Sequence, residues 1–311
     1  MHIGVFGAGL VGTGWSIVFA RGGEQVRVYD ASKAARDRIR DDVAGRLADL
    51  QVVGLVDDPD AILARVEVCD DMAAVIEGAK YVQESVPERV PLKQDVSRQI
   101  AALLGPDTVV GSSTSGIPAS AFTEDLPNRD RFLVAHPVNP PYLVPVVEVA
   151  PAPWTDPAAV DTAMAVMSGV GQSPILVRRE IEGFILNRLQ GVLLREAWAL
   201  LEEGKVRLDQ RVAEIIPEFA DLGKDVITLE QVLTFTSGFP LAPMHPRLWE
   251  DREARLERMR GWRLNWEPGT RYQYHATPAH WVLMEVIYRC TGLDFREYLR
   301  RRILYPMGVP D

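Results

Sequence analysis

One histidine and one glutamate in the middle of the chain have the types and the setting for acid–base chemistry. His136 ends an apolar run, FLVAH, and Glu148 lies within a second apolar run, VVEV. A carboxylate inside an apolar strand is costly to bury alone, and an imidazole partner offsets that cost. Such a partner also fixes the tautomer of the histidine and raises its basicity, which suits proton removal from a hydroxyl group. The ordinary alternative is a histidine satisfied in the core, but a dinucleotide motif upstream favours catalysis.

That motif is a glycine-rich turn, GAGLVG, near the start of the chain. Gly7 permits a tight turn, Gly9 lets the backbone approach a diphosphate, and Gly12 lets a helix pack on the preceding strand. The free amides around Leu10 and Val11, at the positive end of that helix, suit a diphosphate. Such a motif alone is weak evidence, but here it follows a strand and opens a helix.

An aspartate completes the predicted cofactor site. Asp30 ends the second predicted strand, residues 24–29. There its carboxylate can accept hydrogen bonds from an adenosine ribose, and it would repel a 2′-phosphate. The sequence therefore predicts NAD rather than NADP as the cofactor. The alternative is a glycine turn followed by an unrelated helix-capping aspartate.

Strands and helices that alternate along the chain must position these residues. This order predicts a Rossmann-type, doubly wound α/β fold, in which His136 faces the cleft at the carboxyl ends of the strands. Strands are predicted at residues 2–6, 24–29, 81–84, 109–112, 132–136, 146–149 and 175–177. Helices are predicted from about residue 12 to 21 and at residues 32–50, 71–77, 93–104, 158–170 and 183–203.

Composition excludes several classes of protein. The 311 residues are 47% hydrophobic and 25% charged, with a net charge of -9, so no basic surface for nucleic acid or an anionic membrane is expected. Cys69 and Cys290 are far apart and are expected to be reduced thiols, with no metal site. The apolar N-terminal run lacks a basic flank, and no run is long enough to span a bilayer, so we expect a cytoplasmic protein without membrane or nucleic-acid partners.

The first 205 residues resemble the 3-hydroxyacyl-CoA dehydrogenase superfamily, nearest to its lambda-crystallin type, whose members act as L-gulonate 3-dehydrogenase. The motifs that carry the resemblance are GAGLVG, VPERVPLK, SSTSG, AHPVNPPY, VVEV and GFILNRL, in that order. The resemblance implies an NAD-dependent enzyme that oxidises a 3-hydroxy acid like L-gulonate, or a 3-hydroxyacyl-CoA. Carnitine-type dehydrogenases are related. The sequence has no obvious basic cluster for CoA, which favours the smaller acid.

The resemblance also implies roles for single residues. His136 is the general base and Glu148 its partner, and Ser115 hydrogen-bonds the reacting oxygen. Asn187 does the same from the start of the long helix. The resemblance further places Glu88 and Lys93 in contact with NAD. Each assignment has an ordinary alternative: a turn residue for Ser115, a polar contact at a helix start for Asn187, and a solvated ion pair for Glu88 and Lys93.

The sequence changes character after about residue 205. Arginine becomes frequent, Lys224 is the single lysine that follows, and four of the seven tryptophans lie here. The stretch 207–310 resembles an incomplete fragment of a beta-lactamase-type serine hydrolase. Such enzymes need a Ser-x-x-Lys nucleophile and a Lys-Thr-Gly-like strand, which are both missing, and Ala276 stands two residues after Tyr274 where asparagine is usual. No hydrolase activity is therefore expected.

Three segments are predicted: an NAD-binding domain at 1–182, the first helix of the dehydrogenase C-terminal domain at 183–205, and the hydrolase-like fragment at 206–311. The mostly helical fragment replaces the helices that form the dimer interface in the dehydrogenase family. It is expected either to be partly ordered or to pack its tryptophans on the dehydrogenase part. Two functions follow, a working dehydrogenase or a catalytically impaired NAD-binding module with an inactive hydrolase fragment. The sequence does not separate a natural fusion from a recombinant, engineered or assembled one.

Overall fold

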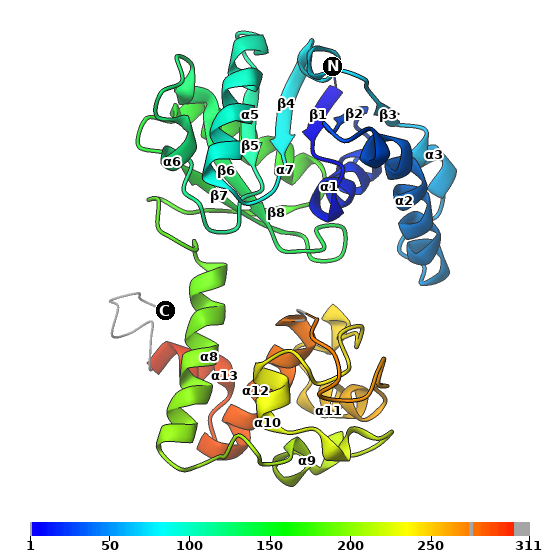
Figure 1. Cartoon of the computed structure of the whole chain (residues 1–311), viewed down its shortest axis with the longest axis vertical. Helices are drawn as coiled ribbons and strands as arrows, with labels where there is room; N and C mark the ends of the chain where they lie inside the picture. Colours follow the sequence, from blue (N-terminus) through cyan, green and yellow to red (C-terminus); the bar gives the residue numbers. More distant parts are fainter. Residues whose placement is uncertain (1, 274–275, 302–311) are drawn as a thin grey trace. The chain divides into compact units, whose positions relative to one another are not determined.

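A computed structural model describes residues 2–273 and 276–301 of the chain (Figure 1). It divides into two compact units, unit 1 at Met1–Arg188 and unit 2 at Leu189–Asp311. Tyr274, singled out in the hydrolase-like segment, lies outside the described residues.

Unit 1 contains one sheet of eight strands in the order β3-β2-β1-β4-β5-β6-β7-β8. The strands are β1 (His2–Phe6), β2 (Val26–Tyr29), β3 (Val66–Val68), β4 (Ala79–Glu84), β5 (Val109–Ser112), β6 (Phe132–Pro137), β7 (Val146–Pro151) and β8 (Ser173–Leu176). All neighbouring strands pair in parallel except β6 and β7, which are antiparallel. The predicted Rossmann-type α/β fold is thereby confirmed, although the sequence revealed neither β3 nor the reversal at β7.

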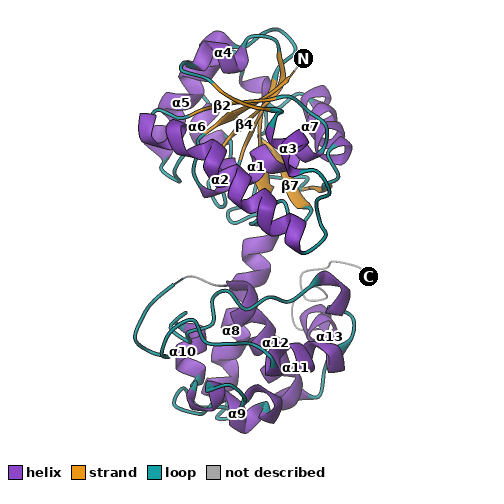
Figure 2. Cartoon of the chain, turned by 90° about the vertical axis from the view of Figure 1, so that its right-hand side faces the viewer, coloured by secondary structure: helices purple, strands orange, loops and turns teal. Residues whose placement is uncertain are grey.

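Helices cover both faces of this sheet (Figure 2). They are α1 (Leu10–Arg21), α2 (Lys33–Val52), α3 (Pro59–Leu63), α4 (Met72–Ile76), α5 (Val90–Leu103), α6 (Ser120–Thr123) and α7 (Pro157–Gly169), with a 3-10 turn at Arg129–Arg131. One core cluster includes Trp15 of α1, Val43 of α2 and Met167 of α7. A second includes Val75 of α4 and Ile100 of α5. The sheet is thus buried on both sides, as parallel sheets require.

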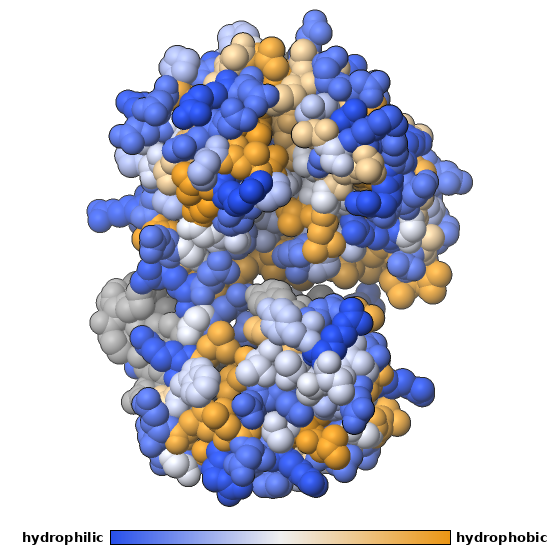
Figure 3. Space-filling view, in the orientation of Figure 1, coloured by the Kyte–Doolittle hydropathy of each residue, from blue (hydrophilic) through white to orange (hydrophobic). Residues whose placement is uncertain are grey.

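Exposed apolar side chains of unit 1 include a group at the C-terminal end of α2. Val52 is 87% exposed and Val53 is 65% exposed, with Leu55 close behind them in sequence. Apolar side chains are visible at this end of α2 in Figure 3, beside an otherwise mixed surface. Among the described residues, no helix has the length and apolar character that crossing a membrane requires.

Unit 2 is helical and has a hydrophobic core of its own. Its helices are α8 (Leu186–Glu202), which begins in unit 1, α9 (Val212–Ile215), α10 (Leu229–Leu233), α11 (Arg252–Arg260), α12 (Ala276–Thr291) and α13 (Phe295–Leu299). Short 3-10 turns lie at Pro217–Phe219, Lys224–Val226 and Pro246–Leu248. The core includes Trp262, stacked on Phe239 with ring centroids 5.7 Å apart, and Ile287 of α12. The prediction of a mostly helical C-terminal region is confirmed.

A buried lysine ties loops of unit 2 together. Lys224 is fully buried, and its Nζ donates hydrogen bonds to the backbone oxygens of Asp221 at 2.5 Å, Arg260 at 3.0 Å and Trp262 at 2.7 Å. Burial lowers the pKa of this ammonium group. Three carbonyl acceptors match its three donors, so the single lysine after residue 205 has a structural role.

Candidate active site

The histidine and the glutamate predicted to carry out acid–base chemistry lie side by side. His136 of β6 and Glu148 of β7 are direct partners in the antiparallel register, which places their side chains on the same face of the sheet. His136 Nδ1 and Glu148 Oε2 are 2.7 Å apart, and the two residues are only 6% and 2% exposed. The reversal of β7 therefore creates the contact that the sequence predicted only from residue types.

The second oxygen of this carboxylate is held by backbone amides. Glu148 Oε1 accepts hydrogen bonds from the amides of Ile185 at 2.7 Å and Leu186 at 2.8 Å, where α8 begins. Gly183 and Phe184 precede them with positive φ angles of 72° and 46°, so the chain turns sharply before the helix. Amides at a helix start favour a charged carboxylate. One oxygen of Glu148 is thereby held by the two amides, and the other lies against the imidazole.

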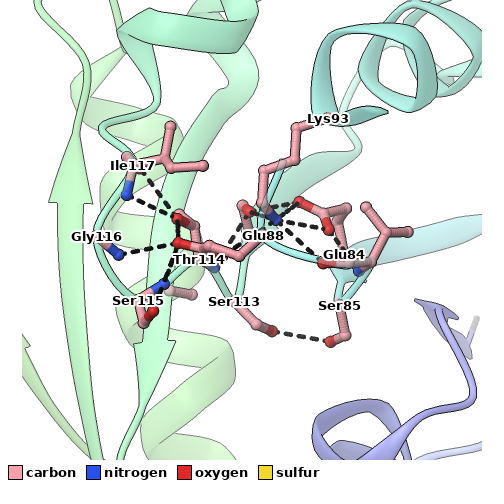
Figure 4. Close-up of polar contacts among 12 residues, drawn as sticks. Glu84, Ser85, Glu88, Lys93, Ser113, Thr114, Ser115, Gly116 and Ile117 are labelled. Carbon is pink, nitrogen blue, oxygen red and sulfur yellow. Dashed lines mark hydrogen bonds and ion pairs between the residues drawn. The ribbon is translucent and has the colours of Figure 1, made fainter. Parts of the chain in front are cut away.

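Ser115 and Asn187 also meet. Asn187 Nδ2 donates a hydrogen bond of 2.5 Å to the backbone oxygen of Ser115. On its other side, the loop that carries Ser115 is held by Glu88, whose Oε1 accepts from the amides of Ser115 and Gly116 at 3.0 Å and from Thr114 Oγ1 at 2.6 Å (Figure 4). Glu88 therefore anchors the Ser115 loop in this structure, a contact that the sequence did not indicate.

These contacts give Glu88 an acid-dependent role in stability. Burial alone raises the pKa of the Glu88 carboxyl, but hydrogen bonds from Thr114 and the Gly116 amide, together with the Lys93 charge, hold it below its ordinary value of 4.5. A group with a lowered folded pKa contributes stability that is complete above its unfolded pKa and is lost as the pH falls through the folded one. We expect Glu88→Gln to reduce the free energy of unfolding most above pH 4.5, with a difference that shrinks in more acid solution. Denaturant unfolding of both proteins across the acidic range measures this, and a difference independent of pH would contradict it.

Lys93 lies deeper than Glu88. Lys93 is fully buried, and its Nζ lies 3.0 Å from both carboxylate oxygens of Glu84 and 4.0 Å from Glu88 Oε2. The Ser112 hydroxyl also donates a hydrogen bond to the Glu84 carboxylate. The Val86 amide donates another to Glu84 Oε1, at 2.6 Å. This buried ion pair joins the ends of β4 and β5 to α5. Glu84 was not predicted as a functional residue, although it closes the predicted strand at residues 81–84.

The glycine turn lies between the end of β1 and the start of α1. Gly7 has a φ of +98°, and a Cβ added at Gly12 would lie 1.8 Å from the backbone oxygen of Gly7. A Cβ at Gly9 would meet nothing within 4 Å, so the space that a diphosphate would need is open. The first amides of any α-helix have no acceptor within the helix, and in α1 these include the amides of Leu10 and Val11. Gly9, the N-cap residue, has no side chain that could accept from them.

Asp30 contacts this turn from the end of β2. Its Oδ2 accepts a hydrogen bond of 2.8 Å from the Ala8 amide, and its Oδ1 accepts one of 2.8 Å from the Ser32 amide. Each carboxylate oxygen can accept two hydrogen bonds, so capacity remains for a ribose diol. The residues present therefore fit a dinucleotide: open amides for the diphosphate and an acidic acceptor for the ribose. Among the described residues, no cluster of three histidine, cysteine or acidic side chains forms a metal site.

A doubly wound sheet with an open glycine turn and a buried histidine–carboxylate pair defines a dinucleotide-binding α/β domain. Residues 2–181 match the family described as 3-hydroxyacyl-CoA dehydrogenase, NAD binding domain. The chain belongs to this family, and its cofactor is NAD. Residues 197–311 match the beta-lactamase family. Both resemblances seen in the sequence are confirmed.

Characterised relatives cover the same part of the chain. Lambda-crystallin of Oryctolagus cuniculus is 38% identical over 205 residues, which are 65% of this chain and 64% of the relative. L-carnitine dehydrogenase of Pseudomonas putida is 36% identical over 198 residues, 64% of this chain and 61% of the relative. The chain thus spans less than two thirds of these relatives.

Two solved structures of dehydrogenases are also similar to this chain. The NAD⁺-dependent 5-formyl-3-hydroxy-2-methylpyridine 4-carboxylic acid 5-dehydrogenase is 35% identical, with a TM-score of 0.58 and coverage of 66% of each chain. The 3-hydroxybutyryl-CoA dehydrogenase of Escherichia coli K12 is 28% identical with a TM-score of 0.63, covering 77% of this chain and 47% of that one.

Proposed function

We propose that the chain is an NAD-dependent dehydrogenase that oxidises the hydroxyl group of a 3-hydroxy acid. The observation that carries the proposal is the buried His136–Glu148 pair, with Nδ1 and Oε2 2.7 Å apart on paired strands. The names of the relatives support the same class of reaction, since they include L-carnitine dehydrogenase and 3-hydroxybutyryl-CoA dehydrogenase.

The geometry of the pair supports proton transfer from the substrate to His136. With its Nδ1–H donated to Glu148, His136 keeps a basic lone pair on Nε2, which accepts the proton of the substrate hydroxyl. Glu148 would stabilise the resulting imidazolium, and the two amides on its Oε1 hold the carboxylate in place. NAD, when bound, supplies the hydride acceptor.

Two further groups are proposed to face the reacting oxygen. Asn187 Nδ2 carries two N–H donors, of which one serves the Ser115 backbone oxygen, so the second can donate to substrate. The Ser115 hydroxyl lies 3.4 Å from Glu88 Oε1, a long contact that a substrate oxygen can replace. Donors placed in this way stabilise the carbonyl oxygen as it develops.

The cofactor is proposed to bind along the carboxyl edge of the strands. The backbone of Gly9, Leu10, Val11 and Gly12 would hold the diphosphate, and Asp30 the adenosine ribose. Glu88, with a side chain 40% exposed, is the accessible member of the predicted Glu88–Lys93 contact to NAD. The buried Lys93 would act from behind it, through its charge.

One set of measurements tests this function in the full chain. NADH is titrated by fluorescence, with NADPH as the comparison, and NAD reduction is then assayed with L-gulonate, 3-hydroxybutyrate and 3-hydroxybutyryl-CoA. We expect NADH to bind more tightly than NADPH, because Asp30 repels a 2′-phosphate. We expect turnover to be fastest with L-gulonate, on the resemblance to the lambda-crystallin type. Turnover of the CoA ester alone would contradict the smaller substrate.

A second candidate function is an NAD-binding module that lacks turnover. The match of residues 197–311 to the beta-lactamase family favours it, because those residues replace the later helices of a dehydrogenase. NADH binding without reduction of NAD by any of the three substrates would support this alternative.

A further inference from the structure

A chain of polar side chains lies behind the carboxyl edge of β4 in unit 1. Tyr81 OH donates to Gln83 Oε1 at 2.8 Å, and Gln83 Nε2 donates to Ser113 Oγ at 2.7 Å. Ser113 Oγ also receives Trp15 Nε1 at 3.0 Å and lies 2.9 Å from Ser85 Oγ (Figure 4). Tyr81, Gln83 and Trp15 are fully buried, whereas Ser85 is partly exposed.

The neighbours of Gln83 fix how its amide is oriented. Gln83 Nε2 lies 3.1 Å from the backbone oxygen of Ala135, which can only accept a hydrogen bond. This atom must therefore be the nitrogen, and its second N–H points to Ser113 Oγ. The indole nitrogen of Trp15 is likewise a donor only. Ser113 thus receives two hydrogen bonds from groups that cannot reverse.

This fixes the direction of the contact between the two serines. A hydroxyl oxygen has two lone pairs, and both lone pairs of Ser113 are occupied by Gln83 and Trp15. Ser113 must therefore donate its proton to Ser85 Oγ. The proton of Ser85 then needs another acceptor, and the part of the chain that the structure describes provides none for it. Ser85 is partly exposed, so this proton is available to water or to a ligand bound at the carboxyl edge of the strands.

Ser85 lies against the glycine turn. Its amide donates to the backbone oxygen of Phe6, the last residue of β1, at 2.7 Å. A Cβ added at Gly7 would lie 2.6 Å from the Ser85 backbone oxygen. In the strand order β2-β1-β4, Asp30 follows β2, the glycine turn follows β1 and Ser85 follows β4. If Asp30 meets the adenosine ribose and the turn meets the diphosphate, the next group along the dinucleotide reaches Ser85: the ribose attached to nicotinamide.

We infer that Ser85 is a further NAD-binding residue, whose hydroxyl donates a hydrogen bond to an oxygen of the nicotinamide-side ribose. The inference rests on the proposed NAD site and adds a donor on the half of the cofactor that reacts. Trp15 and Gln83 are positioning residues, because they act only by turning the Ser113 proton toward Ser85.

Binding measurements on Ser85→Ala in the full chain test the inference without any turnover. NADH is titrated by fluorescence, and ADP-ribose and ADP are titrated by calorimetry. ADP-ribose carries the second ribose but no nicotinamide, and ADP carries neither. We expect the Kd of NADH and of ADP-ribose to rise by about three- to tenfold, the usual effect of one lost hydrogen bond, with no change for ADP. Ser168→Ala, at an exposed serine of α7, is the matched control and should change none of the three.

A second pair of variants separates binding from folding. Ser85→Thr keeps the hydroxyl group, and Ser85→Val has nearly the same shape as the threonine variant but no hydroxyl group. Only the valine variant should therefore lose ADP-ribose affinity. Equal ADP-ribose affinity in wild type and Ser85→Ala, or an equal loss for ADP, would overturn the role of Ser85. A folded wild-type chain that binds neither NADH nor ADP-ribose would overturn the NAD site itself, and this inference with it.

Discussion

Replacement of His136 by glutamine is expected to lower the rate of NAD reduction by about 10³-fold, within the range that a general base contributes. Glutamine has no basic nitrogen to accept the substrate proton. Its side-chain N–H can still donate to Glu148, so the buried carboxylate keeps a partner and the fold is retained. NADH affinity should be almost unchanged, because the residues proposed to hold the cofactor lie elsewhere. The initial rate of NADH formation and a fluorescence titration measure the two effects.

The matched control is His245→Gln, because His245 is an exposed histidine of unit 2. This variant should retain both turnover and NADH affinity. Wild-type turnover in His136→Gln would show that His136 is not the base. An equal loss of turnover in the two variants would show that the effect is not specific to the buried pair.

Substitution of Gly12 by alanine should have the second large effect, this time on stability. The new Cβ would lie 1.8 Å from the Gly7 backbone oxygen, so the turn or the start of α1 must move. Overpacking of this kind costs about 3 kcal/mol in the free energy of unfolding. The distorted turn should also lose NADH binding. Denaturant unfolding of the full chain, monitored by circular dichroism, measures the loss of stability.

Gly9→Ala provides the contrast within the same turn. Its Cβ would meet nothing within 4 Å, so stability should match wild type. The same methyl group would occupy the space proposed for the diphosphate and should weaken NADH binding about tenfold, as overpacking does. Equal stability of the Gly12 and Gly9 variants would contradict the packing argument, and unchanged NADH affinity in Gly9→Ala would contradict the placement of the diphosphate.

Much of unit 1 could be predicted because its residues carry strong local signals. The strand Val109–Ser112 has the predicted bounds, and the glycine turn and Asp30 lie where the motif places them. The direction of β7 could not be predicted, because a short apolar run is the same in either direction. The three-residue strand β3 is too short to show a period. The hydrogen bonds from the amides of Ile185 and Leu186 could not be predicted either, because a backbone amide is present whatever the side chain is.

The burial of Lys93 was also not predicted from the sequence. Lys93 opens the predicted amphipathic helix at residues 93–104, where a lysine is normally solvated, and the sequence left a solvated pair with Glu88 open. In the structure Lys93 is fully buried against Glu84, which lies at the end of a neighbouring strand. Only tertiary packing brings these two charges together. For the segment after residue 205, the sequence left partial order as one expectation, but Trp262, Phe239 and Ile287 share a core within unit 2.

The two amides that hold Glu148 come from residues 185 and 186, and the first unit ends at Arg188. The last candidate catalytic residue, Asn187, precedes that boundary by a single position. A genetic crossover anywhere beyond Arg188 would therefore carry the complete set of reacting groups into a new protein. One placed a few codons earlier would remove Asn187 and replace the residues whose amides hold the carboxylate. On the proposed roles of these residues, exchange of the polypeptide after the first turn of α8 would leave every candidate catalytic residue in place.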